Sequence, residues 1–191
     1  MVATIAKPIA SPVTLGCFLQ MPETKPASEY IDNEITQKSM PKGRHSCLQY
    51  EICNAINHVT KPQKIAYALP ELRCTFDNRS IVPDIAVFKW QNTPFLENGE
   101  IPDQFNLAPD WMIEILSPDQ NANKVIGKIL HSLQHGTQLG WFLDPSDRSI
   151  LTFLPERQPV LMTGGDLLPV IDIVPLELSV DAIFGWLKMG K

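Results

Sequence analysis

The chain has 191 residues, enough for one domain with a sizeable hydrophobic core and too few to expect two. Hydrophobic residues make up 44% and charged residues 19%, a balance typical of globular proteins. The net charge of −5 argues against nucleic-acid binding through a generally basic surface, because affinity for phosphate comes largely from Lys and Arg. It does not exclude an enzyme acting on phosphates, since a metal ion or a local basic patch can supply the positive charge.

The four cysteines and the chain ends indicate the compartment. None of the cysteines forms a CxxC pair, so their spacing predicts no zinc site, and we interpret them as small apolar side chains in a reducing environment. No apolar run is long enough to span a membrane, and Pro8 and Pro12 interrupt the short apolar stretch near the start. We therefore expect a cytoplasmic protein without a signal peptide or a membrane partner.

The first third of the chain predicts a lead-in, a hairpin and a helix. Residues 1–28 contain four prolines and little periodicity, which predicts an irregular lead-in before a single domain over residues 29–191. Residues 29–38 predict two short strands around a turn at Asp-Asn. Apolar residues then recur at the spacing of one helix face, which predicts a helix over residues 44–60.

The middle of the chain predicts strands. Residues 65–76 indicate an extended segment, and residues 81–89 and 111–116 indicate two further strands. The last two are almost continuously apolar, which is typical of strands buried on both faces. Each is interrupted by one carboxylate, Asp84 in the first and Glu114 in the second.

The last third alternates helices and short strands. A helix is expected after Pro118, ending at Gly136. A hairpin over residues 139–143 and 149–154 and further short strands over 159–171 follow it. A final helix is expected over residues 179–189, with Ser179 as its N-cap. This order of elements predicts an α/β (α+β) fold in which helices flank a mixed β-sheet.

The two strand carboxylates are the first candidates for a functional site. An ionised carboxylate in a buried strand is costly unless it is paired or binds a cation. On adjacent strands, Asp84 and Glu114 could converge and offer the hard oxygen ligands that Mg²⁺ prefers. A metal held there could polarise a phosphate and help to generate hydroxide from water. Periodicity alone also allows the alternative that Asp84 caps a turn and Glu114 pairs with a surface cation on an edge strand.

Such a site would need a lysine to orient water or to offset developing charge. In the commonest arrangement the lysine lies two residues after the glutamate, but that position is Leu116 here. The nearest candidates are Lys124 and Lys128, one helical turn apart and away from the apolar stripe of the next helix. The alternative is that both are solvated surface lysines.

Several sequence blocks occur together in a characteristic order. They read YIDNEI at residues 30–35, RH at 44–45, VPDIAV at 82–87, PDWMIEILSP at 109–118 and GWFLDP at 140–145. These blocks resemble the Uma-type family of restriction endonucleases, long a domain family of unknown function and a branch of the PD-(D/E)XK nuclease superfamily. The resemblance extends over residues 29–187 and implies a restriction-endonuclease-like fold.

The resemblance also implies an activity and a site. It implies a Mg²⁺-dependent endonuclease that hydrolyses DNA phosphodiester bonds, with Mn²⁺ as a substitute metal and a homodimer as the working form. Asp84 and Glu114 would be catalytic metal ligands, with the Ile115 backbone carbonyl as a third. Lys128 falls where the family places its catalytic lysine, on the helix after the Ser-Pro turn.

Five further residues are secondary candidates. Glu34 matches the hairpin glutamate of the family, either near the metal or as an exposed hairpin residue. His45 is expected near the cleft, in contact with phosphate, and Lys124 remains the second lysine. His131 and His135 have the i, i+4 spacing that can hold a metal, although no HExxH pattern accompanies them.

The sequence departs from the family pattern at a few positions. Asn33 replaces the usual Gly, which is tolerable because Asn adopts left-handed turn conformations. The family usually has Ser or Thr at the position of Asp119, an acidic residue at that of Lys124 and an aromatic residue at that of Ser132. These changes leave open a second hypothesis, a non-catalytic nucleic-acid-binding or protein-interaction module with a vestigial nuclease site.

Overall fold

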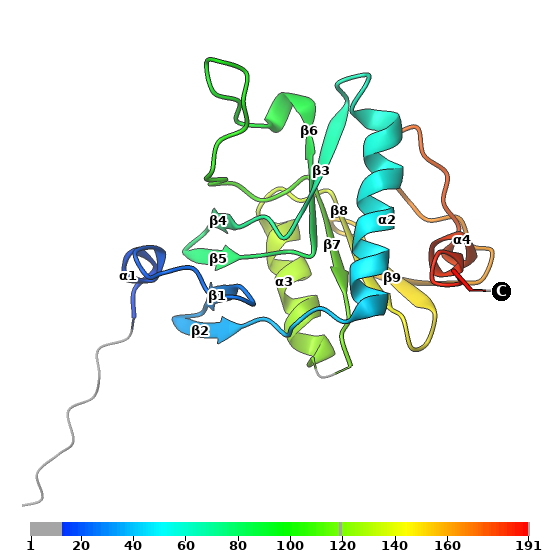
Figure 1. Cartoon of the computed structure of the whole chain (residues 1–191), viewed down its shortest axis with the longest axis horizontal. Coiled ribbons are helices and arrows are strands. Elements are labelled where there is room, and N and C mark those ends of the chain that lie inside the picture. The colour runs from blue at the N-terminus through cyan, green and yellow to red at the C-terminus, as the bar shows by residue number, and fades with distance from the viewer. Residues whose placement is uncertain (1–12, 119, 191) are drawn as a thin grey trace, which may run out of the picture.

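The computed structural model describes residues 13–118 and 120–190, so the departure at Asp119 lies outside the described residues. This part of the chain contains four α-helices and two β-sheets (Figure 1). The combination confirms the α+β fold class expected from the order of the elements.

The larger sheet has six strands and forms the centre of the molecule. Its strands lie in the order β10 (Val160–Thr163), β9 (Ser149–Phe153), β8 (Leu139–Asp144), β7 (Trp111–Ile115), β6 (Ile85–Lys89) and β3 (Ala66–Pro70). Strands β7 and β8 are parallel and every other neighbouring pair is antiparallel, so the sheet is mixed, as predicted.

The smaller sheet has four strands, in the order β2 (Glu34–Gln37), β1 (Ser28–Ile31), β5 (Arg79–Ile81) and β4 (Cys74–Phe76). The hairpin predicted over residues 29–38 is its β1–β2 pair. Asp32 and Asn33 form the turn with positive φ angles of 52° and 65°. Asn33 therefore adopts the left-handed conformation that makes it an acceptable replacement for glycine.

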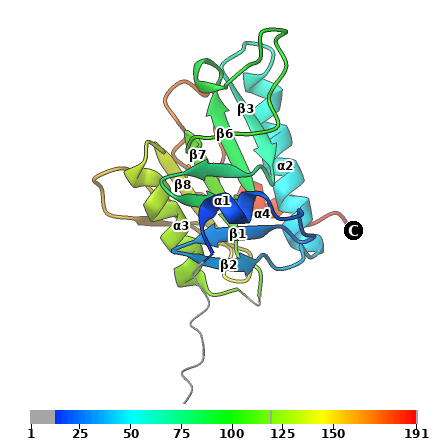
Figure 2. The ribbon, with the colours of Figure 1, turned by 90° about the vertical axis from the view of Figure 1, so that its left-hand side faces the viewer.

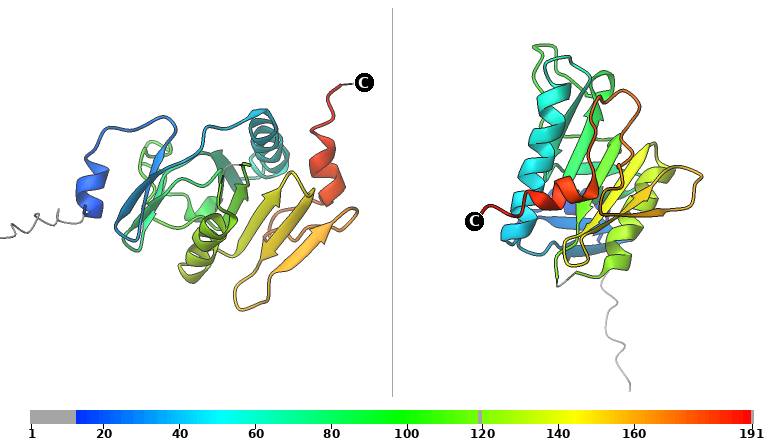
Figure 3. Two further views of the ribbon diagram at one scale, coloured as in Figure 1. Left: turned by 90° about the horizontal axis from the view of Figure 1, so that it is seen from below. Right: turned by 90° about the vertical axis from the view of Figure 1, so that its right-hand side faces the viewer.

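Helices cover both faces of the large sheet (Figure 3). Helices α2 (Gly43–Thr60) and α4 (Val180–Gly185) pack on one face, against strand residues such as Ile85 and Ile113. Helix α3 (Ala122–Gln134) packs on the other face, against the neighbouring strand residues Ala86 and Met112. The small sheet lies on the α3 side, with its β1–β2 hairpin beside that helix (Figure 2).

Two predicted strands are divided in the structure. Residues 65–76 were expected to form one extended segment, but β3 and β4 belong to different sheets, and Glu71 turns the chain between them with a φ of 47°. The strand predicted over residues 81–89 is divided in the same way between β5 and β6. Asp84 therefore directly precedes β6 instead of lying inside a strand.

The ends of the described chain differ in detail from expectation. The lead-in contains a short helix, α1 (Leu15–Leu19), whose buried Phe18 stacks on Tyr30 at a centroid distance of 5.7 Å. Ser179 caps α4 by accepting a hydrogen bond from the Ala182 N–H, as predicted, but the helix ends at Gly185. A short 3₁₀ helix, η1 (Trp90–Asn92), follows β6.

Two further expectations concern membranes and cysteines. None of the helices in the described part of the chain combines the length and the apolar character that a membrane span needs. The four cysteines are free thiols, and burial raises the pKa of both Cys53 and Cys74 to about 12. Both thiols therefore stay protonated and pack as small apolar groups.

Candidate active site

Strand pairing brings the two predicted carboxylates together. Strands β6 and β7 pair Ile85 with Ile113, and continuing this antiparallel register by one residue sets Asp84 opposite Glu114. Opposite residues of an antiparallel pair project from the same face of a sheet. Asp84 Oδ2 also accepts a hydrogen bond of 2.7 Å from the Ile115 N–H. Each carboxylate side chain is only 1% exposed, so both are buried acids and neither lies on a surface edge.

Lys128 reaches this pair from α3. Its Nζ lies 2.9 Å from Glu114 Oε1 and donates a 3.0 Å hydrogen bond to Glu29 Oε1. Lys128 is 5% exposed, which rules out the alternative that it is a solvated surface lysine. Burial alone would lower the pKa of Lys128, but the charges of Glu114, Glu29 and Asp84 outweigh it and raise the pKa well above its usual range. The ammonium group therefore stays protonated.

A second cluster of polar groups surrounds Asp84. Lys38 Nζ donates a 2.6 Å hydrogen bond to Asp84 Oδ1 and a second bond to the Val82 carbonyl. His45 Nε2 lies 3.3 Å from the same Oδ1, while its Nδ1 is 3.3 Å from Ser117 Oγ. The backbone carbonyl of Asp84 accepts a 2.7 Å hydrogen bond from Gln49 Nε2. These contacts fix both the side chain and the backbone of Asp84.

The two carboxylates respond oppositely to this environment. Burial would raise the pKa of Asp84, but the contact with His45 and the charges of Lys38 and Lys128 outweigh it and hold the pKa well below its usual range. Burial raises the pKa of Glu114 to about 8, because the attraction of Lys128 does not offset burial and the repulsion from Asp84. Asp84 is thus a permanent anion, whereas Glu114 gains charge only near neutral to basic pH.

Two buried polar atoms at this site have no directed hydrogen bond within the described residues. They are Glu114 Oε1, despite its ion pair with Lys128, and His45 Nε2. Buried polar atoms are rarely left unsatisfied in folded proteins. Glu114 Oε1 already lies beside the Lys128 ammonium group and His45 Nε2 beside Asp84 Oδ1, so a metal ion would have to displace Lys128 to bind Glu114.

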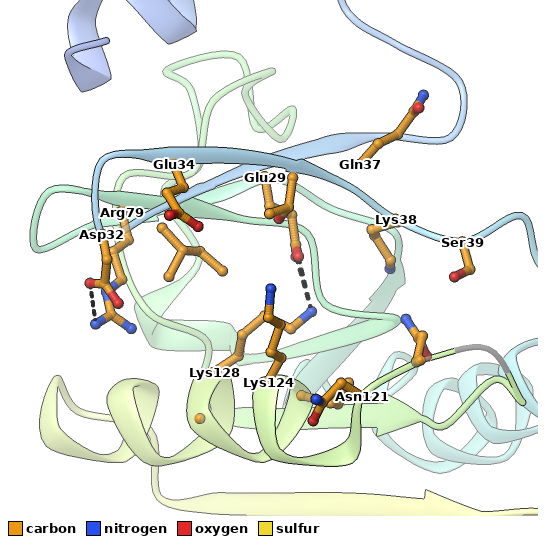
Figure 4. Close-up of a pocket in the computed structure, with 15 residues that line it drawn as sticks. Glu29, Asp32, Glu34, Gln37, Lys38, Ser39, Arg79, Asn121, Lys124 and Lys128 are labelled. Carbon is orange, nitrogen blue, oxygen red and sulfur yellow. Dashed lines mark hydrogen bonds and ion pairs between the residues drawn. The ribbon is translucent and has the colours of Figure 1, made fainter. Parts of the chain in front are cut away.

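A cleft of about 700 Å³ opens beside the buried carboxylates, between the β1–β2 hairpin and the start of α3 (Figure 4). Lys38 and Lys128 line it and also contact the carboxylates, so the two ammonium groups lie between the cleft and the buried pair. Arg79 adds a third cation, held to Asp32 at 2.7 Å. With Lys124, four cations and three carboxylates line the cleft, so it has a small excess of positive charge on an acidic protein.

The secondary candidates separate into three groups. His45 lies at the site, in contact with Asp84. Glu34 and Lys124 are exposed residues in the lining of the cleft, in agreement with the reading of Glu34 as an exposed hairpin residue. His131 and His135 lie farther along α3, beyond Lys128.

Sequence reasoning missed three participants: Glu29, Lys38 and Gln49. Besides binding Lys128, Glu29 accepts a 2.8 Å hydrogen bond from the Val82 N–H, which ties the small sheet to the segment that leads into β6. Lys38 directly follows β2, and Gln49 lies one turn after His45 on α2. The one usable signal was the helical spacing of His45 and Gln49. Nothing in the sequence indicated that the hairpin folds over the carboxylates.

Comparisons with known proteins agree with this geometry. The family model Uma2, described as a putative restriction endonuclease, matches residues 16–182. A crystal structure described as a putative nuclease of the family DUF820 from Anabaena variabilis is 50% identical in sequence. The similarity covers 92% of this chain and 99% of the other, with a TM-score of 0.91. No curated protein matches the sequence. With most of its length matched by the family model, the chain belongs to the Uma2 family of restriction-endonuclease-like proteins.

Proposed function

We propose that this protein is a divalent-metal-dependent endonuclease that hydrolyses DNA phosphodiester bonds at the Asp84–Glu114 site. The observation that carries the proposal is the convergence of these two buried carboxylates with Lys128 beside a cationic cleft. Membership of a family described as restriction endonucleases and likeness to a putative nuclease support it.

The residues at the site fit a hard divalent cation. Asp84 and Glu114 would hold Mg²⁺, or Mn²⁺ in its place, with the Ile115 carbonyl as a third oxygen ligand. A metal would take the place that the Lys128 ammonium group now has at Glu114 Oε1, because that oxygen accepts no other hydrogen bond within the described residues. While Glu114 is protonated, Asp84 and Glu29 balance the charges of Lys38 and Lys128, so a bound metal would also have to displace the proton of Glu114. A bound Mg²⁺ supplies Lewis acidity at a phosphate and lowers the pKa of coordinated water.

The protein side chains then have distinct tasks. Lys128 keeps its proton, so it stabilises negative charge at the phosphate and does not accept a proton from water. Glu29 holds the Lys128 ammonium group from the side of the small sheet. Gln49 and the Ile115 N–H orient Asp84, which makes both of them positioning groups.

The cleft supports DNA as the substrate. Four cations line the cleft: Lys38, Lys128, Arg79 and the exposed Lys124. Contacts between such side chains and phosphates supply most of the affinity of proteins for DNA. The glutamates of the hairpin limit that affinity. We further propose that the active form is a homodimer, which light scattering would detect as twice the chain mass.

One observation favours a second candidate, a DNA-binding module without catalysis. Lys38 Nζ already lies 2.6 Å from Asp84 Oδ1, and Lys128 Nζ lies 2.9 Å from Glu114 Oε1. If the ammonium groups stayed there permanently, no metal could enter. The two candidates differ in one respect: only the nuclease needs a divalent ion and Asp84.

Cleavage of supercoiled plasmid and of short duplexes with Mg²⁺ or Mn²⁺ tests the proposal. The parent is expected to nick DNA only with metal, and Asp84→Asn to lose at least about a hundredfold in rate. Asp147→Asn, in an exposed turn between β8 and β9, serves as the matched control and should cleave like the parent. The nuclease assignment would be contradicted if the parent bound DNA without regard to metal and did not cleave it. It would also be contradicted if Asp84→Asn cleaved DNA at the rate of the parent.

A further inference from the structure

A second cluster of potential metal ligands lies where the end of α3 meets the β4–β5 turn, away from the carboxylate pair. It consists of Asp77 in the β4–β5 turn and of His131 and His135 at the end of α3. One ligand atom from each lies within 4.8 Å of the other two. Asp77 Oδ2 is 3.1 Å from His135 Nε2 and 3.7 Å from His131 Nε2. Three donors from two elements therefore point at one small volume.

His135 is oriented as a ligand. Its Nδ1 lies 2.8 Å from the His131 carbonyl oxygen, which can only accept a hydrogen bond, so Nδ1 carries the proton. In the neutral ring, Nε2 then presents a lone pair towards Asp77. Metal-binding histidines commonly have this arrangement, in which a carbonyl holds the other ring nitrogen.

His131 supplies an independent indication. Its side chain is 7% exposed, and within the described residues its Nε2 has no hydrogen-bond partner. The ring is held by stacking on Phe76, at 5.4 Å between centroids and 15° between planes. Burial, and then the nearby charge of Arg79, lower the pKa of His131, so the ring is neutral and able to coordinate. A cation held between Asp77 and the two imidazoles would satisfy this buried nitrogen.

We propose that Asp77, His131 and His135 bind a divalent transition-metal ion of the zinc class. Ligand bonds of about 2.0–2.2 Å in a tetrahedral site place donors roughly 3.4 Å apart. The distances from Asp77 Oδ2 to His135 Nε2 and to His131 Nε2, 3.1 and 3.7 Å, bracket this spacing. Two imidazoles favour Zn²⁺ over Mg²⁺, so this site and the carboxylate pair select different ions. Water would complete the coordination.

The position of the site indicates its effect. Asp77 belongs to the small sheet, which also carries Glu29, and His131 lies one turn after Lys128 on α3. An ion held by Asp77 and both histidines links that sheet to that helix, and these two elements form the walls of the cleft. Zinc would therefore stabilise the relative position of Glu29 and Lys128. This proposal does not depend on DNA cleavage.

Zinc titration of chelator-treated, full-length protein tests the site by calorimetry and by thermal unfolding. The parent is expected to bind one Zn²⁺ with a raised Tm, and Asp77→Asn and His135→Gln are each expected to lose at least about tenfold in affinity. The visible absorption spectrum of the Co²⁺-substituted parent should show the bands of tetrahedral coordination. Absence of thiolate-to-metal charge-transfer bands from that spectrum would exclude the cysteines as ligands.

Two controls keep the test specific. His58→Gln, on the exposed side of α2, should bind Zn²⁺ like the parent, and so should Asp84→Asn, which removes a carboxylate from the other site. Three results would each overturn the proposal. They are Zn²⁺ binding by Asp77→Asn and His135→Gln with the affinity of the parent, loss of Zn²⁺ binding in Asp84→Asn, and absence of Zn²⁺ binding by the parent. In the last case, the contact between His135 and Asp77 is an ordinary ion pair of a protonated histidine.

Discussion

Lys128 places one ammonium group against both Glu114 and Glu29, and its charge is the property that matters for catalysis. Lys128→Met keeps the length of the side chain and removes the charge. We expect the cleavage rate to fall by about 10²–10³-fold, the cost of removing one donor that stabilises transition-state charge. Single-turnover kinetics at saturating Mg²⁺ would measure it.

Lys124→Met is the matched control, one turn earlier on the same helix and exposed to the cleft. It should weaken DNA binding at low salt and leave the single-turnover rate within about tenfold of the parent. Equal rate losses in both variants would contradict the distinct role assigned to Lys128.

Glu114 gives the metal-free protein a specific pH dependence. Its folded pKa of about 8 exceeds the ordinary value of 4.5, so between these values the folded state holds a proton that the unfolded chain has released. The stability contributed by this proton is complete below about pH 4.5 and is lost as the pH rises through about 8. Glu114→Gln cannot titrate, so its stability does not fall over this pH range for this reason.

The difference in Tm between Glu114→Gln and the parent, in EDTA, should therefore grow in favour of the variant from pH 5 to 8 and then level off. Thermal unfolding at several pH values measures it, and other titrating groups cancel in the difference. A difference that stays constant with pH would mean that Glu114 is already ionised in the folded protein.

At the level of elements, α3 carries Lys128 only because it packs tightly on β8. A Cβ atom at Gly140 would overlap Ile129 Cγ2 and touch Phe153 Cβ at 3.5 Å. Ile129 is fully buried and has nowhere to move. Gly140→Ala should therefore lower the free energy of unfolding by about 1–3 kcal/mol, the usual cost of overpacking.

Urea denaturation would measure this change beside Gly127→Ala, a glycine of α3 at which an added Cβ meets nothing within 4 Å. That control should be neutral or stabilising by up to about 1 kcal/mol, because alanine is the better helix former. Equal destabilisation of both variants would show that the contact between Gly140 and Ile129 does not limit the packing.

The elements also show what could be predicted from sequence. Periodicity found α2 and α3, and one carboxylate in each of two apolar stretches identified Asp84 and Glu114. The division of residues 65–76 between two sheets was not predictable, because the turn at Glu71 has a positive φ without glycine or asparagine to indicate it. Glu29 and Lys38 were missed for a related reason. Their roles arise from the packing of the small sheet on α3, a long-range contact with no local pattern.

Across the whole molecule, an acidic chain with a net charge of −5 gathers cations along one cleft and buries its reactive acids behind them. The net negative charge of the chain repels DNA at long range, so binding depends on the cations of the cleft. The burial of the acids behind these cations also means that Lys38 and Lys128 must yield their contacts with Asp84 and Glu114 before a metal can bind there. The proposed activity therefore requires that the two carboxylates can hold a metal ion.

Anomalous diffraction from crystals soaked in Mn²⁺ tests this requirement most directly. The parent is expected to show a manganese peak within bonding distance of both Asp84 and Glu114, with Lys38 and Lys128 displaced from their carboxylate oxygens. Asp84→Asn crystals should lack the peak. Metal binding at this site would be contradicted if parent crystals showed no manganese at Asp84 and Glu114 and kept the ammonium groups of Lys38 and Lys128 on the carboxylates.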